Sequence, residues 1–308
     1  MAEDIPFERR FDAVPGAVEM VAPGVRRVLA PNPGPFTFTG TCTYIVGEGE
    51  VAIIDPGPDN ADHLAAVLAA IPGESVTHIF LTHTHRDHSG ALAALKAATG
   101  APTYAEGPHR AARRLHAQEV NTLDASGDRS FLPDVALADG ARVEGAGWAL
   151  TALATPGHTA NHMAFVLEAD AARSEGVIFV GDHVMGWSTT IVAPPDGSMS
   201  AYMDSLRRLH ARPESFYLPG HGGPIRQGPA FVERFLRHRQ SRERAILRAL
   251  ERGPMAIPDI VRAIYFGLDP RLAHAAGLST LAHMEDLTER GDVLTDGPAV
   301  LGGLYRLP

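Results

Sequence analysis

The 308-residue chain has one cysteine, Cys42, and one lysine, Lys96. A single cysteine excludes a disulfide within the chain and a zinc site made of cysteine thiolates. No stretch approaches the ~18 consecutive apolar residues of a membrane-spanning helix. The charged first ten residues lack the apolar core of a secretory signal. These absences predict a cytoplasmic protein with no membrane segment.

Acidic residues outnumber basic ones, and the formal net charge is −9. The excess lies in residues 1–230, which carry 26 Asp and Glu against 16 Lys and Arg, whereas residues 231–308 carry 10 and 11. A protein that binds nucleic acid through its surface normally shows a broad basic patch. The charge balance therefore disfavours nucleic acid as a partner and favours a small-molecule substrate.

Short apolar runs alternate with helical patterns through most of the chain, which predicts an α/β fold. After residue 230 the pattern changes to successive helices and a terminal hairpin. We therefore expect a catalytic domain over residues 1–230 and a small winged-helix-like domain over residues 231–308. Strands are expected at 25–30, 43–55, 76–81, 102–105, 149–154, 177–181 and 216–218, helices at 60–70, 91–98, 109–118, 231–251, 257–266 and 278–290, and a hairpin within 293–307.

The densest group of polar side chains lies at Leu81–Gly90, where the sequence reads Leu-Thr-His-Thr-His-Arg-Asp-His-Ser-Gly. Imidazole and carboxylate are the ligands that zinc and related ions prefer. An apolar strand precedes the group and an Ala- and Leu-rich helix follows it. The polar side chains are therefore expected on a loop that can direct them to one or two points. Four candidate metal ligands fall within six residues: His83, His85, Asp87 and His88.

Three later motifs repeat the order of a short apolar strand, a turn of small residues and a ligand-type side chain. Thr-Pro-Gly precedes His158, Phe-Val-Gly precedes Asp182, and Leu-Pro-Gly precedes His221. Loops at strand ends are common places for active sites, because the sheet holds them in position. The site is therefore expected to be assembled from four separate loops.

These seven candidate ligands suffice for two metal ions, each held by three side chains, with one carboxylate left to bridge them. Two cations ~3.5–4 Å apart can hold a bridging hydroxide as nucleophile. No serine or cysteine nucleophile is then needed, and the chain has no G-x-S-x-G motif. We expect two zinc ions, and the same ligands would also accept manganese or iron. The first set is His83, His85 and His158, the second is Asp87, His88 and His221, and Asp182 is the bridge.

Residues beside these motifs have candidate roles of their own. We assign Asp87 a second, catalytic role in orienting the hydroxide, and we assign His183 a place in the pocket wall or as a proton donor. Asp55 is expected either to hold an imidazole from behind or only to form the turn before Pro-Gly. Trp187 and Ser188 are expected to contact substrate, with loop packing as the alternative for the tryptophan. Among the other histidines, His162 is expected to form structural hydrogen bonds, and His63, His109, His116, His210, His238, His274 and His283 to be core or surface residues.

The motifs His83-Thr-His-Arg-Asp-His88, Gly157-His158, Gly181-Asp182 and Gly220-His221 together resemble those of the metallo-β-lactamase superfamily, over residues 20–230. The resemblance implies an αββα sandwich, in which two facing sheets lie between helices and the metals sit at one edge. It also implies the same ligand roles. Asp182 is similar to the dinuclear pattern of glyoxalase II, lactonase, phosphodiesterase and RNA-processing members, whereas zinc β-lactamases generally have a residue other than Asp at that step, often Cys or Ser.

A closer resemblance includes the stretch Thr189–Ser200 and the C-terminal module. It points to the lactamase-beta-like subfamily, some of whose members are single-strand-selective endoribonucleases. The expected recognition helix at 278–290 carries three carboxylates and one arginine, and carboxylates repel a phosphate backbone. The Arg-rich helix at 231–251 provides either a phosphate track or a solvated face with Glu233 and Glu243 as partners, and we prefer the second.

We therefore expect a dinuclear zinc-dependent hydrolase that uses the metal-bridging hydroxide on a small ester, thioester or lactone. The alternatives are a metal-dependent endoribonuclease or phosphodiesterase and a weak, promiscuous β-lactamase. A non-catalytic nucleic-acid-binding regulator is disfavoured because the ligand set is complete. The near-neutral tail is expected to provide either the surface of a homo-oligomer or a lid over the pocket.

Overall fold

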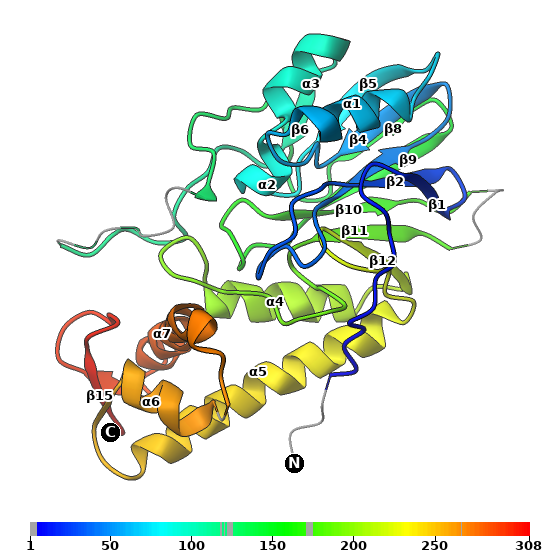
Figure 1. The fold of residues 1–308 in the computed structure, drawn as a ribbon. Coiled ribbons are helices and arrows are strands. Elements are labelled where there is room, and N and C mark those ends of the chain that lie inside the picture. Colours follow the sequence, from blue (N-terminus) through cyan, green and yellow to red (C-terminus); the bar gives the residue numbers. More distant parts are fainter. Residues whose placement is uncertain (1–4, 118, 120, 122–125, 171–174, 266) are drawn as a thin grey trace.

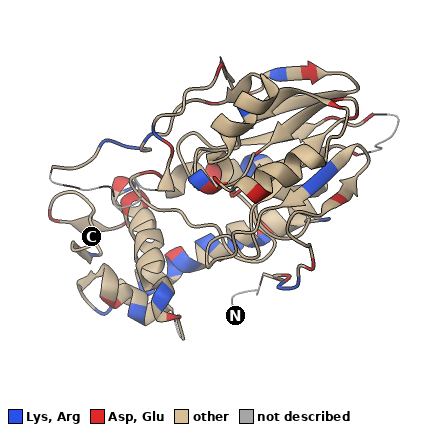
Figure 2. Cartoon of the chain, turned by 45° about the horizontal axis from the view of Figure 1, so that its top comes forward, with Lys and Arg blue, Asp and Glu red and all other residues tan. Residues whose placement is uncertain are grey.

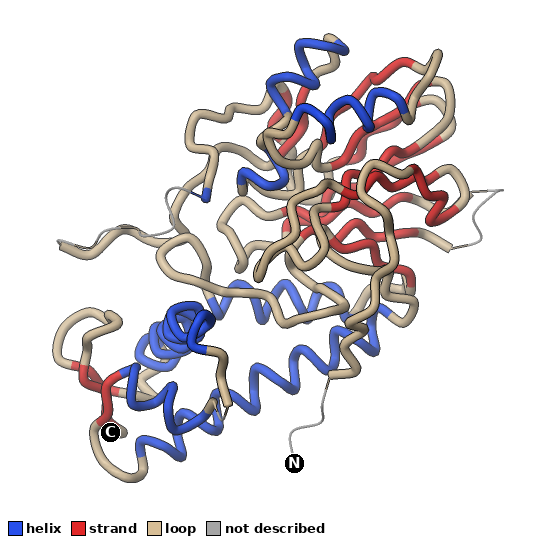
Figure 3. The backbone as a smooth tube through the Cα atoms, in the orientation of Figure 1, coloured by secondary structure: helices blue, strands red, loops and turns tan. Residues whose placement is uncertain are grey.

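Two β-sheets lie face to face at the centre of the molecule in the computed structural model, which describes residues 5–117, 119, 121, 126–170, 175–265 and 267–308 (Figure 1). Helices flank the sheets, and a small helical domain follows at the C-terminal end. The loops gather between the strand ends and these C-terminal helices (Figure 3).

The first sheet has seven strands that lie in the order of the chain. The pairs β1–β2, β2–β3 and β3–β4 are antiparallel. The pairs β4–β5, β5–β6 and β6–β7 are parallel. Parallel strands place their carboxyl ends at the same edge of a sheet. The strands are β1 Val18–Ala22, β2 Val25–Leu29, β3 Cys42–Val46, β4 Glu50–Ile54, β5 Ser75–Phe80, β6 Thr103–Ala105 and β7 Val135–Ala136.

The second sheet has five strands in the order β12-β11-β10-β9-β8. Strand β10 is antiparallel to both β9 and β11, and β12 is parallel to β11. Strands β9, β11 and β12 therefore share one direction and end at the same edge. The strands are β8 Arg142–Gly145, β9 Trp148–Ala154, β10 Met163–Leu167, β11 Val177–Gly181 and β12 Phe216–Pro219.

The main core fills the space between the two sheets. Phe80 of the first sheet meets Phe165 of the second with ring centroids 5.1 Å apart, and Tyr44 meets Phe179 at the same separation. Strands β3, β10 and β11 are buried along their whole length, since helices cover the outer face of each sheet. Burial on both faces explains why these strands are continuously apolar.

Two further apolar layers hold the helices on the sheets. Val67 and Leu95 bring α1 and α3 onto the first sheet, and Tyr202 and Phe235 bring α4 and α5 onto the second. The layer order is helix, sheet, sheet, helix, so the expected αββα sandwich is confirmed. The helices are α1 Ala61–Ala69, α2 Arg86–Ser89, α3 Leu92–Thr99, α4 Met199–His210 and α5 Gly228–Leu250.

The C-terminal domain has its own apolar core, built around Ile260, Met284 and Tyr305. The long helix α5 joins the two parts, because its Val232 packs with the second sheet and its Ile246 packs in the C-terminal core. The boundary predicted at residue 230 falls within this helix and stays a prediction. The elements of this domain are β13 Met255–Ala256, α6 Ile257–Ile264, a 3₁₀ turn Pro270–Leu272, α7 Ala273–Glu289, β14 Leu294–Thr295 and β15 Leu304–Arg306.

Two expected elements are of another kind in the structure, and the helix expected at 278–290 begins earlier, at Ala273. The strand predicted at 43–55 is a hairpin, because Gly47 and Gly49 take positive φ angles of 97° and 75° and reverse the chain. The helix predicted at 109–118 is absent over 109–117, and Gln118 lies outside the described residues. The backbone N–H of Ala112 instead donates to Pro195 O, 2.7 Å away in a distant loop. Tertiary contacts thus override the helical propensity of this stretch.

No described helix combines the length and apolar character needed to cross a bilayer. Arginines are concentrated along α5 (Figure 2), the longest helix of the described chain at 23 residues. Arg237 forms an ion pair with Glu233 one turn away, whereas Glu243 pairs with Arg290, which follows α7. The preferred interpretation of α5, a solvated helix face with Glu233 and Glu243 as partners, therefore agrees with the structure at Glu233 and stays a prediction for the rest of the helix.

The buried side chain of His283 in α7 makes stability depend on pH. Its ring nitrogens have no hydrogen-bond partner, and burial, together with the nearby Arg239, lowers its pKa to about 3. The unfolded chain, with an ordinary histidine pKa of about 6.5, binds a proton more readily. The His283 contribution is therefore fully present above pH 6.5 and is lost as the pH falls from 6.5 towards 3.

We predict that His283→Leu reduces the loss of unfolding free energy between pH 7 and pH 5 by up to about 2 kcal/mol. Urea unfolding at the two pH values measures this difference. The matched change at His210, on the exposed end of α4, should keep the wild-type loss. Equal losses in His283→Leu and the wild type would contradict the prediction.

Candidate metal centre

The carboxyl ends of strands from both sheets meet at one edge of the sandwich. Two backbone hydrogen bonds join the sheets there, from Cys42 N to Gly220 O (2.8 Å) and from Met163 N to Thr82 O (2.7 Å). The seven candidate ligands follow β5, β9, β11 and β12, all of which end at this edge. The sheets thus bring together four loops that are distant in the sequence.

The first cluster consists of three imidazoles. His83 Nε2 lies 3.0 Å from His85 Nδ1, and His158 Nε2 lies 3.1 Å from the same atom. Donor atoms of these three residues and of Asp182 all lie within 4.8 Å of one another. The first expected set is therefore assembled in one place, from two different loops.

The second cluster contains Asp87, His88 and His221. His221 Nε2 lies 3.3 Å from His88 Nε2 and 3.2 Å from Asp87 Oδ2. Asp87 and His88 belong to the short helix α2, whereas His221 follows β12 on the other sheet. The second expected set is thus also brought together.

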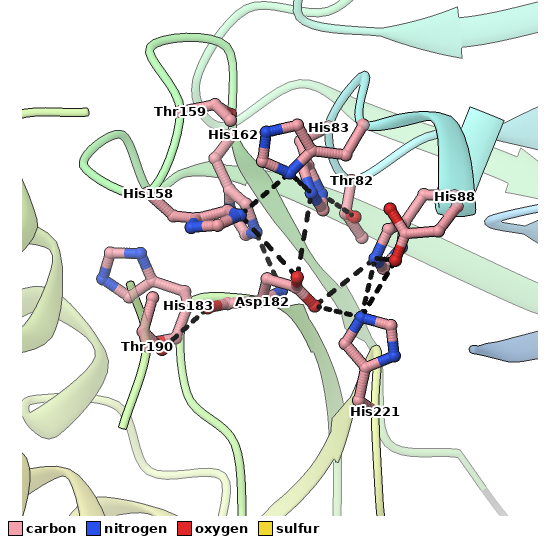
Figure 4. A network of polar contacts seen from close by, with 12 residues as sticks. Thr82, His83, His88, His158, Thr159, His162, Asp182, His183, Thr190 and His221 are labelled. Carbon is pink, nitrogen blue, oxygen red and sulfur yellow. Dashed lines mark hydrogen bonds and ion pairs between the residues drawn. The ribbon is translucent and has the colours of Figure 1, made fainter. Parts of the chain in front are cut away.

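The carboxylate of Asp182 lies between the two clusters (Figure 4). Its Oδ2 is 3.7 Å from His158 Nε2 and 4.0 Å from His83 Nε2. Its Oδ1 is 3.4 Å from both His88 Nε2 and His221 Nε2. Each oxygen therefore faces one cluster, which is the position expected for a bridging carboxylate.

Asp55 supports both clusters from behind. His88 Nδ1 donates a hydrogen bond to Asp55 Oδ2 at 2.9 Å. Thr82 donates two more to the same carboxylate, one from its backbone N–H and one from its hydroxyl, each at 2.8 Å. The Thr82 oxygen in turn lies 3.0 Å from His83 Nδ1. The predicted contact of Asp55 with an imidazole is present. Asp55 also has a φ of 54°, a left-handed conformation that Asp tolerates.

Backbone carbonyls orient two more of the imidazoles. His158 Nδ1 donates to Ile191 O at 2.7 Å, and His221 Nδ1 donates to Gly40 O at 3.2 Å. A carbonyl only accepts, so Nδ1 carries a proton in both rings and Nε2 is the nitrogen that faces the cluster. Such outer hydrogen bonds set the tautomer of metal-binding histidines.

His162 and Gly181 position Asp182. The backbone N–H of Asp182 donates to His162 Nε2 at 3.2 Å, so His162 forms a structural hydrogen bond, as expected for it. A Cβ at Gly181 would lie 2.7 Å from both His162 Nε2 and the Thr82 hydroxyl, and the φ of Gly181 is 47°. Only glycine lets the chain pass this closely before the ligand.

Burial makes the first cluster neutral. It lowers the pKa of His85 to about 3, with His158 adding to the effect, and it also lowers the pKa of His158 and His83. Neutral imidazoles are the form that binds metal. These three side chains therefore need no deprotonation at neutral pH before they can act as ligands.

The second cluster is dominated by its carboxylates. Burial alone would lower the pKa of His221, but Asp182 raises it to about 9, and the pKa of His88 is likewise raised by Asp87 and other carboxylates. In return, His221 and His88 hold the pKa of Asp182 well below its usual value against the effect of burial. The buried negative charge of this cluster thus favours a positive charge beside it.

The donor set fits two metal ions. Ligands of a tetrahedral zinc ion with bonds of about 2.0–2.1 Å are separated by about 3.3 Å, within the range of 3.0 to 4.0 Å between the donor atoms here. Asp182 Oδ1 is buried and has no hydrogen-bond partner, as expected for an oxygen that binds a cation. The His and Asp clusters are thus consistent with a dinuclear metal site.

The clusters form the floor of a cavity of about 440 Å³. His85, Asp87, His158, Asp182 and His221 contribute to its lining. Apolar side chains make most of the walls, and the C-terminal domain closes one side of the cavity. These apolar residues are Phe36, Met185, Ile191, Ala193, Ala275 and Leu278.

The structure does not give His183 the position predicted for it. Its ring is fully buried, lies with its centroid 4.5 Å from that of the Tyr202 ring, and lines neither described cavity. Figure 4 shows it turned away from the metal ligands. Because the backbone reverses direction after Asp182, the next side chain enters the core. Direct proton donation by His183 is therefore replaced by a packing role.

Trp187 and Ser188 lie in an adjoining cavity and not in the one that holds the clusters. The indole of Trp187 stacks on Phe38 with ring centroids 4.8 Å apart and planes 9° apart. The loop packing considered for it is thus present, and the residue also lines this adjoining cavity. Contact of these two residues with substrate stays a prediction.

One polar network near the site has no motif in the sequence. His109 Nε2 lies 3.1 Å from Asp196 Oδ2, its Nδ1 lies 3.0 Å from the Thr84 hydroxyl, and Asn121 donates to Asp196 Oδ1 at 2.7 Å. Asp196 is almost fully buried and lines the metal cavity. The only signal for it in the sequence was an Asp in a Pro-Pro-Asp-Gly turn, which also describes an ordinary loop.

Known proteins share these features. Residues 36–221 match the Metallo-beta-lactamase superfamily, and residues 256–298 match the Beta-lactamase associated winged helix domain. The lactamase-like protein adaB of Aspergillus niger is 30% identical over 84% of this chain and 78% of its own length. The atrochrysone carboxyl ACP thioesterase of Passalora fulva is 33% identical over 76% of this chain, which spans only 63% of that protein.

A solved structure of similar fold covers nearly the whole chain. A metallo-beta-lactamase family protein from Thermus thermophilus superposes with a TM-score of 0.74 at 26% identity, covering 94% of this chain and 100% of that one. The match includes the C-terminal domain as well as the sandwich. The chain therefore belongs to the metallo-beta-lactamase superfamily, as a hydrolase of that fold with a C-terminal winged helix domain.

Proposed function

We propose that the chain hydrolyses thioesters with a dinuclear zinc site. The observation that carries this proposal is the position of Asp182, whose two oxygens face two separate groups of donor atoms at the floor of an apolar cavity. Apolar walls suit an acyl group, and the relative from Passalora fulva is a thioesterase by name. Esters and lactones, which share the reacting carbonyl, remain within the expected substrate class.

The two clusters would hold one ion each, and Asp182 would contact both. Bound together, two such cations lower the pKa of a water and stabilise negative charge on the carbonyl oxygen. Zinc is preferred because all donors are imidazole nitrogens and carboxylate oxygens, and manganese or iron would be accepted by the same set. The ligands of the first ion would be His83, His85 and His158, and those of the second Asp87, His88 and His221.

Asp87 is the carboxylate most open to the cavity. Its side chain is 27% exposed, against 9% for Asp182. It contacts His221 Nε2 at 3.2 Å and keeps free surface towards the substrate side. We therefore assign Asp87 the orientation of the attacking water and the acceptance of its proton.

A thioester suits this cavity better than an amide. A thiolate leaves readily because the pKa of its thiol is about 8.5, so the reaction needs no strong acid to protonate the leaving group. His183, the proton donor expected beside Asp182, is out of reach in the core. The apolar walls meanwhile exclude water from the acyl group, which strengthens electrostatic interactions at the carbonyl.

Nucleic acid remains the less favoured substrate. In α7, Glu285 forms an ion pair with Arg113 of the catalytic domain at 2.6 Å, and Asp286 lies 3.8 Å from Arg290. Glu285 thus joins this helix to the catalytic domain, whereas Asp286 faces an arginine one turn further along the chain. A helix docked in this way does not present a basic face to a phosphate backbone.

We predict two metal ions per chain for the wild type and one for His85→Ala, since this change removes a donor shared by two short contacts of the first cluster.

Asp55→Asn removes no ligand and should weaken metal affinity by about 10- to 100-fold. Metal analysis after dialysis and chelator titration of thermal unfolding measure both effects. His210→Ala, on the exposed end of α4, serves as the control. Two retained ions and full turnover in His85→Ala would refute the assignment.

We further predict the order of turnover on a panel containing an acyl thioester, a lactone, nitrocefin and a single-stranded RNA. The thioester should give the highest kcat/KM, with weak or no hydrolysis of the β-lactam and the RNA. Asp87→Asn should lower kcat on the thioester by about 10²- to 10⁴-fold, the usual contribution of a general base. Cleavage of RNA alone by a chain with two bound ions would replace this proposal with the ribonuclease alternative.

A further inference from the structure

A second cavity of about 420 Å³ adjoins the metal cavity. We call it the arginine compartment. Phe36, Met185, Ile191 and Ala275 line both cavities, so the two cavities meet at these side chains. The arginine compartment lies between the loops of the catalytic domain, helix α5 and the first helices of the C-terminal domain. It is thus present only because the two domains pack together.

The charge of this compartment has one sign. Arg9, Arg239 and Arg242 line it, together with the ring of His238, and no Asp or Glu is among its lining residues. Within the described part of the chain, none of the three arginines forms an ion pair with a carboxylate. A guanidinium keeps its charge in proteins. The compartment is therefore a concave surface with uncompensated positive charge.

Arg239 is the most buried of the three arginines, and no carboxylate of the described chain balances its charge. Only 3% of its surface is exposed, one terminal nitrogen donates to Thr190 O, and its Nε has no hydrogen-bond partner. Burying an unpaired charge is costly. Its ring neighbour is Tyr202, whose centroid lies 5.2 Å from the guanidinium. A bound anion would lower the cost of keeping Arg239 in this place.

Arg242 is more open and stands one turn further along α5. It donates to Ile264 O at 3.0 Å, and its guanidinium lies 4.4 Å from the centre of the Tyr265 ring. These contacts hold the guanidinium of Arg242 beside the C-terminal domain and leave further N–H donors for a ligand. On the opposite side, Trp187 has a buried indole N–H without a partner. The groups that lack partners here are all hydrogen-bond donors.

We propose that the arginine compartment binds the anionic arm of the substrate thiol while the acyl group occupies the metal cavity. This inference rests on the proposed thioesterase function, since it names the class of thiol that the thioester carries. An arm with a phosphate, such as phosphopantetheine, and an arm with carboxylates, such as glutathione, both supply the acceptors that these donors need. The C-terminal domain then acts as a wall of the substrate site.

The test compares thioesters that share one acyl group and differ only in the arm: acyl-pantetheine, acyl-4′-phosphopantetheine and acyl-glutathione. For the wild type we expect a KM about tenfold lower for an anionic arm than for the neutral one, which corresponds to about 1.4 kcal/mol. Arg242→Gln should bring this ratio close to one, and Arg242→Lys should retain part of it. The phosphate and carboxylate substrates show which anion is preferred.

Two further variants separate charge recognition from folding. Arg9 is exposed and lies on the N-terminal segment, so Arg9→Gln should reduce the ratio without any change in thermal stability. Arg244, exposed on α5 and outside the compartment lining, is the matched control, and Arg244→Gln should keep the wild-type ratio. Added salt should weaken the preference in the wild type.

Calorimetric binding of free 4′-phosphopantetheine and pantetheine gives a readout that does not depend on turnover. We expect the phosphorylated compound to bind more tightly, and Arg242→Gln to remove the difference. Equal KM and equal binding for charged and neutral arms would overturn this inference while leaving the thioesterase proposal intact. Arg242-dependent binding of 4′-phosphopantetheine without hydrolysis of any thioester would support the compartment and refute the proposed reaction.

Discussion

The carboxylate of Asp182 is the group on which the arrangement of the site depends. It is buried between two sets of imidazoles, and each of its oxygens faces one set. A buried carboxylate requires positive charge or hydrogen-bond donors around it, and here one oxygen has no donor of its own. The close-packed glycine before it and the hydrogen bond from its N–H to His162 hold it in this position. The geometry is thus prepared for cations before any substrate arrives.

The two sheets provide the precision that such a site needs. Asp55 ends β4, and the loop after β5 starts beside it, since these strands are parallel neighbours. One carboxylate can therefore hold His88 directly and His83 through Thr82. Ligands supported by hydrogen bonds on rigid strand ends lose little entropy when they bind metal. The same sheet edge also opens into the apolar cavity, so the candidate metal ligands and the cavity share one platform.

The C-terminal domain completes this cavity instead of presenting an outer binding face. Its acidic helix α7 is joined to the catalytic domain by Glu285 and Arg113, and its core continues along α5. The domain places Tyr265 beside Arg242, next to the cavity wall. A module that resembles a nucleic-acid-binding fold here closes one side of the cavity beside the candidate metal ligands, because its Ala275 and Leu278 face that space.

The sequence by itself determined an α/β fold, the helix-rich tail and the candidate ligands of both clusters, because each ligand is marked locally by an apolar strand and a turn of small residues. The sandwich arrangement was implied by the resemblance to a known family. Propensity failed in two places: Gly47 and Gly49 turn an expected single strand into a hairpin, and a contact with a distant loop accompanies the loss of the helix expected near Ala112. Only the tertiary structure decided that His183 turns into the core, that Asp196 reaches the cavity, and that two arginines of α5 face one compartment. Such orientations depend on the packing of segments far apart in the chain, and no local pattern encodes them.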